Sequence, residues 1–499
     1  MGGSIHERLK AIVGAERVRT EPKTLKKYSK DQSFIRPCIP EYVVFAETVP
    51  EVEDVLKAAN DTKTPVVPVS SGMNLRGAAI PKEGGIILDL SRMNKVGQIN
   101  DGEGWVVIEP GVTYGQLAQE LEQHNLRVMT PLGVPRSRSV VTSIIEGDPT
   151  LASASFEYGN ALYLDVEIVL PAGWTWRVGK WRTRVGGEWS TPGGGGKVTT
   201  NLYPLMWETA QGTLGVITKL VVKVEHLIPK VSQVFVIPFD RLEAAIEPLR
   251  RIQRKELGLE CFLLNNFNLA AVRAEDWDVP ESFPCPKGAC DGFNSLRGRL
   301  PKWTMVIHLA GLPYFPEEKV AYEEEALRAV CSEMGLPLAQ TVAGEEGLEA
   351  SLLDLILHPW MALKKARFKG SFHPVSCYTI LRKVPEFEEA VLALAQEHGY
   401  PIGDIGAYML PIERGRNCYL EFDFHCDLEN PGDVERVKNL WLQTNRVCAD
   451  KGAVLAKPYG PCADIIYRRV QASYVDLLRK WKNALDPNNI MNPGQLCFY

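Results

Sequence analysis

The chain has 499 residues, of which 45% are hydrophobic and 23% charged, and its formal net charge is -5. A chain of this length exceeds what one hydrophobic core supports, so we expect two or more domains. The mild acidity argues against nucleic-acid binding, which requires a basic surface. The sequence contains no run of about 18 or more apolar residues, so it predicts no membrane-spanning helix.

The cysteines and the amino-terminal stretch indicate the compartment. Eleven Cys, an odd number, are spread along the chain, which is typical of reduced cytosolic thiols. The stretch MGGSIHERLKAIVG has no apolar signal core, so we expect a cytoplasmic protein. Cys285 and Cys290 form the closest cysteine pair, but they lack the further ligands of a zinc or iron–sulfur site, so we expect no metal.

The first half of the chain mixes helices and strands. Ser4 and Thr48 are placed as N-caps of two amphipathic helices. Short β-rich runs predict strands at 41–47, 65–69, 86–93, 105–110, 162–173 and 212–229, with a helix at 113–126. The glycine run TPGGGGKVTT, 191–200, is expected to be a flexible surface insertion.

From about residue 229 strands and amphipathic helices alternate. Strand-then-helix pairs are predicted at 231–239 and 240–256, at 303–311 and 317–335, and at 377–385 and 386–399. This order favours an antiparallel sheet backed by helices, which is a domain of the α+β kind. The tail from residue 473 predicts a helix that a turn rich in Pro, Asn and Gly ends.

Six separated segments carry a family resemblance. They read KKYSKDQSF (26–34), PVVPVSSGMNLRGAAIP (65–81), GGIILDLSRMNKV (84–96), VVIEPGVTYGQLAQEL (106–121), GTLGVITKL (212–220) and LDPNNIMNPGQ (485–495). In this order they resemble the FAD-linked oxidases and dehydrogenases of the vanillyl-alcohol oxidase and p-cresol methylhydroxylase type.

The resemblance implies an α+β protein with two domains. An FAD-binding domain in two subdomains would comprise residues 1–228, with residues 460–499 returning to it. A substrate-binding cap domain, residues 229–459, would carry an antiparallel sheet covered by helices. The cap region resembles the family only loosely.

The loop after the strand at 65–69 indicates the cofactor. Taken alone, it also fits a plain tight turn. In the resembling family this loop gives backbone N–H groups to the FAD pyrophosphate, because consecutive amides converge on an anion and glycine lets them approach. The implied FAD contacts are Pro68, Ser70, Ser71, Gly72, Met73, Asn74, Leu75, Pro131, Ser139, Thr142, Ser143, Gly215, Val216, Ile217 and Asn492.

The chain departs from the family in a second loop. Where relatives have glycines, it has Arg136, Ser137, Arg138, Ser139 and Thr142. The two arginines either supply positive charge in place of backbone amides or are solvated loop residues.

A second departure concerns the covalent tether. Relatives often bond FAD through a His in the first loop, where this chain has Leu75 and Arg76. Another route in the family uses a cap-domain His or Tyr, and His373 lies near that position. We therefore expect non-covalent FAD, with a link through the His373 region as the alternative.

The segment NCYLEFDFHCD, 417–427, is the first candidate for catalytic groups. Apolar side chains at 418, 420, 422, 424 and 426 alternate with Tyr419, Glu421, Asp423 and His425. The polar face either lines the flavin pocket or faces water. In a pocket, its carboxylates and His are suited to acid–base work or to binding one divalent ion.

The rest of 408–468 supplies further candidates. Arg416 is suited to clamping a carboxylate or phenolate. Tyr467 and Arg468 resemble a Tyr-Arg pair of the phenol-oxidising branch, whereas Lys457 and Tyr459 stand where hydroxy-acid dehydrogenases have a His-containing loop. The catalytic candidates are His425, Tyr459, Arg416, Glu421, Tyr467 and Arg468.

The resemblance implies an FAD-dependent oxidoreductase. It would oxidise a small alcohol, a 2-hydroxy acid or a 4-alkylphenol by hydride transfer to flavin N5 and pass electrons to a partner acceptor. The alternatives are an oxygen-using oxidase, a flavin-bearing subunit of a larger redox complex, and a non-redox or reductive role for the flavin. We also expect a homo-oligomer.

Overall fold

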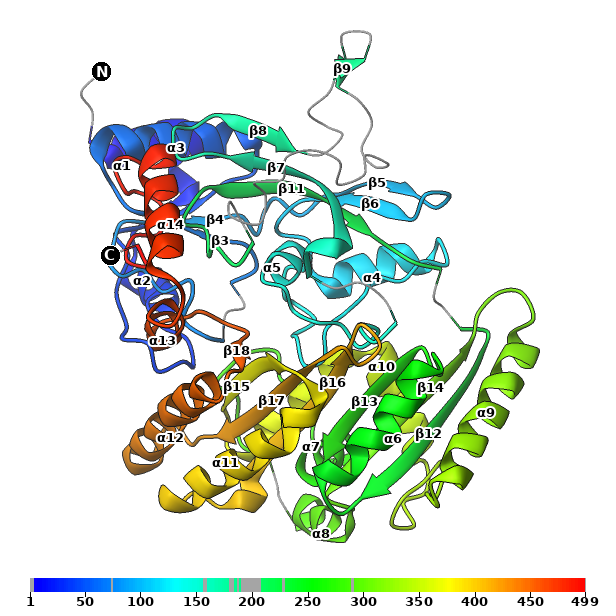
Figure 1. Ribbon diagram of the computed structural model, residues 1–499. Coiled ribbons are helices and arrows are strands. Elements are labelled where there is room, and N and C mark those ends of the chain that lie inside the picture. Colours follow the sequence, from blue (N-terminus) through cyan, green and yellow to red (C-terminus); the bar gives the residue numbers. More distant parts are fainter. Residues whose placement is uncertain are drawn as a thin grey trace.

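The computed structural model describes residues 4–72, 75–155, 159–178, 184–185, 188–189, 208–226, 229–288 and 291–498. The glycine run at 191–200 lies outside them. Figure 1 shows two N-terminal sheets above a larger sheet that carries helices, with the carboxyl-terminal helix α14 (Ala472–Leu485) beside the N-terminal sheets. Within this described part, no helix is both long and apolar enough to cross a membrane.

The first sheet has the strand order β1-β2-β4-β3, and β2, β4 and β3 run parallel. The helices packed on it begin at their predicted caps: Ser4 accepts from the Glu7 N–H and Thr48 accepts from the Glu51 N–H, both at 3.4 Å. The elements of this part are α1 (Ile5–Val13), β1 (Val18–Arg19), α2 (Pro22–Tyr28), β2 (Tyr42–Phe45), α3 (Val49–Thr62), β3 (Val66–Val69) and β4 (Ile86–Asp89).

The second sheet is antiparallel, with the order β5-β6-β11-β7-β8. Two helices, α4 and α5, cover it and share one apolar core with β6, β7 and β11. The elements are β5 (Val96–Asn100), β6 (Trp105–Ile108), α4 (Tyr114–Glu122), α5 (Val140–Ile145), β7 (Tyr163–Val169), β8 (Thr175–Val178) and β11 (Val216–Lys223). A separate two-stranded ribbon joins β9 (Arg184–Val185) and β10 (Glu188–Trp189).

The carboxyl terminus returns to the first sheet. Met491 forms a parallel bridge with Val66, and the Asn492 N–H donates to the Val66 carbonyl at 2.9 Å. Asp486 holds this turn, because its carboxylate accepts the backbone N–H of Ile490 and of Met491. The end of the chain therefore lies beside β3, whose following loop is the predicted cofactor loop.

The third sheet is the expected antiparallel sheet, with the order β12-β14-β13-β16-β17-β15-β18. Its strands are β12 (Val231–Phe239), β13 (Glu260–Asn265), β14 (Trp303–Gly311), β15 (Phe372–Thr379), β16 (Ile405–Ile412), β17 (Asn417–His425) and β18 (Val454–Leu455). Alternate side chains of the strands from β12 to β17 enter two different apolar cores, so both faces of the sheet are covered.

Helices lie on both faces of this sheet. One face packs against α6 (Leu242–Arg254), α9 (Pro316–Glu333), α11 (Val384–Glu397) and α12 (Pro431–Asp450). The other packs against α7 (Asn266–Arg273), α8 (Asp291–Arg299), α10 (Leu348–Leu357) and the 3₁₀ segment η5 (Pro359–Phe368). A short helix, α13 (Pro461–Tyr467), contacts α12 and leads into the tail.

One predicted strand was misplaced. The expected strand at 377–385 is β15, Phe372–Thr379, and Leu381–Lys383 form a 3₁₀ turn. Pairing with β17 fixes these bounds, since Phe372 lies opposite His425 and Thr379 lies opposite Cys418. This long-range pairing has no signal in the local sequence.

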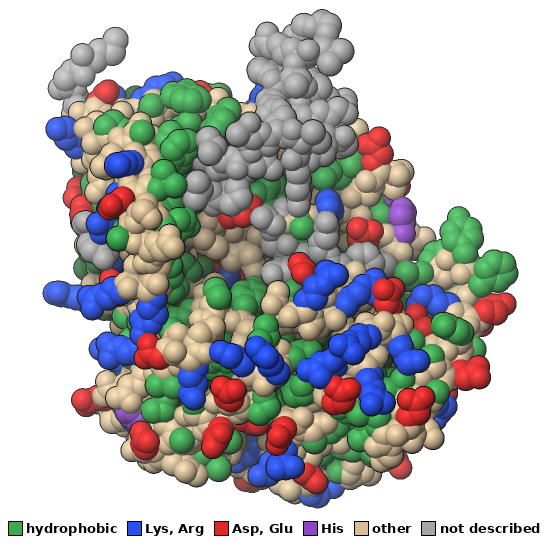
Figure 2. Space-filling model, viewed as in Figure 1, with side chains coloured by type: hydrophobic (Ala, Val, Ile, Leu, Met, Phe, Trp, Pro, Cys, Tyr) green, Lys and Arg blue, Asp and Glu red, His purple; other side chains and the backbone are tan. Residues whose placement is uncertain are grey.

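The surface bears charges of both signs. Figure 2 shows Lys and Arg interspersed with Asp and Glu over the lower part of the molecule, where the third sheet and its helices lie. Mixed charge of this kind is typical of a solvated surface.

Candidate functional site

The first cavity lies between three loops at the edge of the N-terminal sheets. The loop after β3, the turn entering α5 and the segment before β11 surround a space of about 970 Å³ that is partly open to solvent. Ser70 Oγ lies 2.5 Å from Thr142 Oγ1, and the Ser139 N–H donates to Ser71 Oγ at 3.1 Å. These bonds join the first two loops.

The walls of this cavity suit a phosphate-bearing cofactor. A Cβ on Gly212, whose φ is +68°, would overlap Pro68, and one on Gly215 would lie 2.7 Å from the Val169 carbonyl oxygen. Both positions therefore require glycine, so that the loops can pack closely. Gln211 Oε1 is buried without a hydrogen-bond partner in the described part of the chain. Closely packed loops with a spare polar atom fit FAD at this place.

The predicted FAD residues separate into groups. Those that line the first cavity are Pro68, Ser70, Ser71, Gly72, Thr142, Gly215, Val216 and Ile217. Ser139 and Ser143 are buried behind it, and Asn492 donates to the Gln211 carbonyl. Leu75 and Pro131 line a second cavity instead. Met73 and Asn74 lie outside the described residues.

The structure distinguishes the two arginines of the second loop. Arg136 is exposed, with its guanidinium 5.9 Å from the Trp360 ring centre. Arg138 is largely buried, pairs with Glu146 at 2.6 Å and lines both the first and the second cavity. Its Nε has no hydrogen-bond partner among the described residues. Arg138 therefore agrees with the prediction that an arginine supplies positive charge at this loop, whereas Arg136 agrees with the alternative of a solvated loop residue.

The second cavity lies between the N-terminal half and the third sheet. It encloses about 650 Å³. Residues of the β3 loop, of segments near 131–135 and 146–149, and of strands β15, β16 and β17 line it, together with Lys457 and Tyr459. The first and second cavities share Arg138 and Glu146 in their walls, so the two cavities adjoin each other.

Arg76 connects the two halves of the protein at this cavity. Its guanidinium donates to Ser376 Oγ of β15 at 3.0 Å and lies 3.5 Å from Glu421 Oε2 of β17. Glu421 also accepts from Tyr419 Oη at 2.6 Å and lies 3.6 Å from Lys365 Nζ. The Glu421 carboxylate is therefore held between a phenol and two cations.

A second ionic cluster lies where the two cavities meet. Lys457 Nζ contacts Asp148 Oδ1 at 2.5 Å and donates to the Glu146 carbonyl at 2.9 Å, and Arg138 lies 3.5 Å from Asp148. Burial alone would raise the pKa of Asp148, but Lys457 and Arg138 outweigh it and hold that pKa well below its usual range. Asp148 is thus ionised, and its charge is balanced inside the protein.

Three buried tyrosines complete the polar lining. Burial raises the pKa of Tyr408, Tyr419 and Tyr459 well above the usual value, and nearby carboxylates add to the rise. These side chains remain neutral phenols, so their hydroxyls act as hydrogen-bond donors in the cavity.

The predicted catalytic residues do not form one group. Glu421 and Tyr459 line the second cavity. Arg416 and Tyr467 line another cavity, beside Tyr378. Arg468 is the residue that follows α13, at its carboxyl end.

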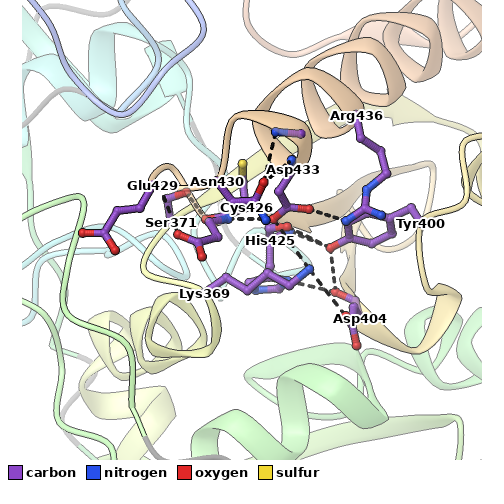
Figure 3. A network of polar contacts seen from close by, with 12 residues as sticks. Lys369, Ser371, Tyr400, Asp404, His425, Cys426, Glu429, Asn430, Asp433 and Arg436 are labelled. Carbon is purple, nitrogen blue, oxygen red and sulfur yellow. Dashed lines mark hydrogen bonds and ion pairs between the residues drawn. The ribbon is translucent and has the colours of Figure 1, made fainter.

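His425 lies in a different part of the third sheet. Its backbone N–H donates to Tyr400 Oη at 2.8 Å, and its Nδ1 lies 2.9 Å from the Asp404 carbonyl. Figure 3 shows it within a polar network that includes Lys369 and Asp433. Its ring stacks on Phe267 at 4.3 Å, so it belongs to the packing of the sheet and lines neither of the first two cavities.

The alternation predicted along 417–427 is observed. The apolar side chains enter the core under α11 and α12, and Tyr419 and Glu421 reach the cavity. Among the described residues, no group of three or more His, Cys, Asp or Glu is placed to hold a metal ion.

His373, the alternative tether, does not line the second cavity, although the cavity that it lines shares Arg76, Lys457 and Tyr459 with it. Its ring stacks on Phe34 with the centroids 4.0 Å apart, and burial lowers its pKa to about 3. It lines a neighbouring cavity of about 670 Å³ together with Trp441.

Sequence reasoning missed Lys365 and Asp148, and it treated Arg76 only as a missing histidine. Lys365 stands in the ordinary helical run WMALKKARF, and Asp148 stands in the turn EGDPT. The one local signal for Asp148 is its position directly before Pro149 in a turn. Lys365 has no local signal that distinguishes it from its neighbours.

Two family descriptions match the chain. "FAD binding domain" matches residues 40–179, and "FAD linked oxidases, C-terminal domain" matches residues 418–496. The first range includes the loop after β3 and the turn into α5. The second begins on β17 and includes Glu421, Lys457 and Tyr459.

Known proteins are similar over most of the chain. A D-lactate dehydrogenase from Anaerostipes hadrus is 30% identical over 480 residues, covering 92% of this chain and 90% of that protein. The 4-cresol dehydrogenase [hydroxylating] flavoprotein subunit from Pseudomonas putida is 30% identical over 179 residues, 35% of this chain and 34% of that protein. The crystal structure of p-cresol methylhydroxylase with substrate bound matches 99% of this chain and 96% of its own, with a TM-score of 0.82 and 20% identity. The fold, with its antiparallel cap sheet, is that of p-cresol methylhydroxylase.

Proposed function

This chain belongs to the family of FAD-linked oxidases and dehydrogenases, and we propose that it oxidises a small neutral 4-alkylphenol in the second cavity. The protein is an FAD-linked oxidoreductase. The residues that line the first cavity would hold the FAD, and residues 229–459 would act as the cap over the substrate. Bound FAD would supply a hydride acceptor.

The charge balance of the second cavity carries this proposal. Among the described residues, each of the four cations in the wall of this cavity or directly behind it lies within 4 Å of a carboxylate. The cations are Arg76, Arg138, Lys365 and Lys457, and the carboxylates are Glu146, Asp148, Glu421 and Asp423. A negatively charged substrate would add an unbalanced charge to this buried site, which is costly. A neutral phenol adds no charge.

The apolar part of the lining also suits a phenol. Leu75, Leu132, Val134 and Phe372 contribute hydrocarbon surface to the cavity. A flat aromatic ring can bury against such a wall while its hydroxyl reaches the polar end.

The polar end offers a base and a cation for the substrate hydroxyl. Glu421, supported by the Tyr419 hydroxyl at 2.6 Å, would accept the hydroxyl proton. The Arg76 guanidinium, 3.5 Å from Glu421, would stabilise the oxygen anion that remains.

A 2-hydroxy acid is the second candidate substrate. The similarity to a D-lactate dehydrogenase over 92% of this chain favours it. Its carboxylate would have to draw Arg76 away from Glu421 to obtain a cation. The two candidates therefore differ in whether the Arg76–Glu421 pair persists when the substrate binds.

We also propose that a separate protein accepts the electrons and that the FAD is held without a covalent bond. The relative from Pseudomonas putida is named a flavoprotein subunit, which supports a partner. His373 is not among the residues that line the first or the second cavity, and Leu75 and Arg76 stand where relatives have the tethering His of the first loop, which supports a non-covalent cofactor.

Flavin bleaching under anaerobic conditions tests the substrate class. We expect 4-ethylphenol to bleach the flavin of the purified holoprotein, whereas 4-ethylanisole, the same molecule with its hydroxyl methylated, leaves it oxidised. D-lactate is the matched test of the second candidate. Bleaching by D-lactate and not by 4-ethylphenol would overturn the proposal. Release of flavin on acid precipitation tests its non-covalent attachment.

A further inference from the structure

A buried row of charged groups continues from Glu421 away from the second cavity. Lys365 Nζ lies 3.6 Å from Glu421 Oε1 and 2.6 Å from Asp423 Oδ2. The Lys365 side chain is 4% exposed, and that of Asp423 is fully buried. Glu421 and Asp423 point the same way because they are two residues apart on β17. Only Glu421 of these three lines the cavity.

Asp423 has an incomplete set of partners. Its Oδ1 is buried with no hydrogen-bond partner in the described part of the chain. The titratable and charged groups around it are Lys365 of η5, Glu421 and His425 of β17, and Tyr408 of β16. The neutral amide of Asn268, on α7, is also next to it. Burial raises the pKa of Asp423 to about 7, the Glu421 charge adds to the rise, and Lys365 opposes it.

We propose that Lys365 and Asp423 form a proton store behind Glu421, which receives the proton that the substrate hydroxyl loses. In the first step the substrate O–H bond breaks and an O–H bond forms on Glu421. Next, Lys365 gives a proton from Nζ to Asp423 and takes the proton of Glu421. The net result is a neutral Asp423, while Glu421 is again a carboxylate and Lys365 again an ammonium.

The geometry of Lys365 suits a positioning residue of this kind. Its Nζ is the one atom of the row within ion-pair distance of both carboxylates. It also lies 4.6 Å from the Phe372 ring centre, and Phe372 lines the cavity. A lysine can lose and regain a proton in such surroundings, whereas an arginine stays protonated.

The store has a chemical purpose in a closed site. If Glu421 kept the proton, it would be neutral and could no longer form an ion pair with Arg76. Moving the proton to Asp423 restores the Arg76–Glu421 ion pair while the substrate anion is present. The inference rests on the proposed function, because it needs a substrate with an ionisable hydroxyl.

Proton counting on ligand binding tests the store without turnover. The probe is phenol, which has no alkyl carbon to oxidise and whose pKa is about 10, like that of tyrosine. Calorimetric titration of the FAD-bound protein at pH 7, in two buffers of different ionisation enthalpy, gives the number of protons released. We expect about half a proton for the wild type, because the pKa of Asp423 is about 7 and about half of its carboxylates are free to take up the phenol proton at this pH.

Two variants remove the store in different ways. Asp423→Asn removes the carboxylate that would accept the proton. Lys365→Met removes the cation that keeps Asp423 ionised, so Asp423 is already protonated before phenol binds. For either variant we expect close to one proton released per phenol bound, because Glu421 must then pass its proton to solvent to become a carboxylate again beside Arg76. Asp404→Asn is the matched control, since Asp404 is a largely buried carboxylate paired with another lysine, Lys369 (Figure 3). Asp404→Asn should release the same number of protons per phenol bound as the wild type.

The outcomes separate the store from the proposed function. Equal proton counts for the wild type and both store variants would overturn the store and leave the phenol proposal standing. Phenol that binds to none of the proteins would overturn the phenol proposal, and the store with it. If Asp423→Asn does not fold, Lys365→Met decides in the same assay.

Discussion

Replacing Lys457 by Met tests the ionic cluster where the two cavities meet. The change keeps the length of the side chain but removes the cation that lies 2.5 Å from Asp148 and donates to the Glu146 carbonyl. Arg138 then faces two carboxylates alone, with side-chain exposures of 12% for Arg138 and 13% for Asp148. Removing one partner of a buried ion pair costs about 3–5 kcal/mol, because it leaves a charge uncompensated. Urea titration of the holoprotein should show a loss of this size.

The double variant Asp148→Asn/Lys457→Met separates lost charge from lost packing. It leaves the Arg138–Glu146 pair intact and neutral overall. Its loss should be smaller than the sum of the two single losses by about 0.5–3 kcal/mol, the usual range for groups in one network. Additivity within about 0.5 kcal/mol, or a Lys457→Met loss below about 1 kcal/mol, would refute the electrostatic reasoning.

Three further outcomes follow from the site. Glu421→Gln should slow anaerobic flavin reduction by about 10²–10⁴-fold with unchanged FAD content, as stopped-flow absorbance measures, because the base is lost; an unchanged rate would exclude Glu421. Gly212→Ala should lower the FAD content of the purified protein, since the new Cβ overlaps Pro68; full occupancy would contradict the proposed walls. The native pKa of Asp423 is about 7 against an ordinary 3.8, so the folded state holds this proton more tightly than the unfolded chain. As pH rises from 4 to 7, wild type should therefore lose stability relative to Asp423→Asn, and the difference should level above pH 7. A difference independent of pH in urea titrations would contradict this.

Local signals predicted much of the fold. The caps at Ser4 and Thr48 and the β-branched run in β11 lie where the sequence placed them, because such features act within a few residues. The bounds of β15 did not follow, since Pro374 interrupts its pattern and its pairing partner is about 45 residues away. The order of the seven strands depends on such pairings throughout.

The site was predictable only in part. The loop after β3 is continuous in sequence and carries its own glycine; Ser70, Ser71 and Gly72 line the first cavity, whereas Leu75 lines the second. The second cavity gathers Arg76, Asp148, Glu421 and Lys457 from separate segments, and Lys365 lies behind Glu421. Each is an ordinary charged residue in its local context. They can be recognised as parts of one site only because the fold buries them next to one another.

The arginine of the second loop explains why several of these residues occur together. A glycine-rich loop would bring only backbone amides to this place, whereas Arg138 brings a full positive charge into a largely buried position. Burial of that charge requires a carboxylate, which Glu146 provides at 2.6 Å. Asp148 adds a second carboxylate, and Lys457 restores neutrality from the other half of the chain. Arg138 and Glu146 belong to the walls of both cavities, so this balanced cluster lies between the proposed FAD site and the proposed substrate site. The departure from glycine is thus consistent with the proposed neutral substrate, because the cluster already balances its own charges.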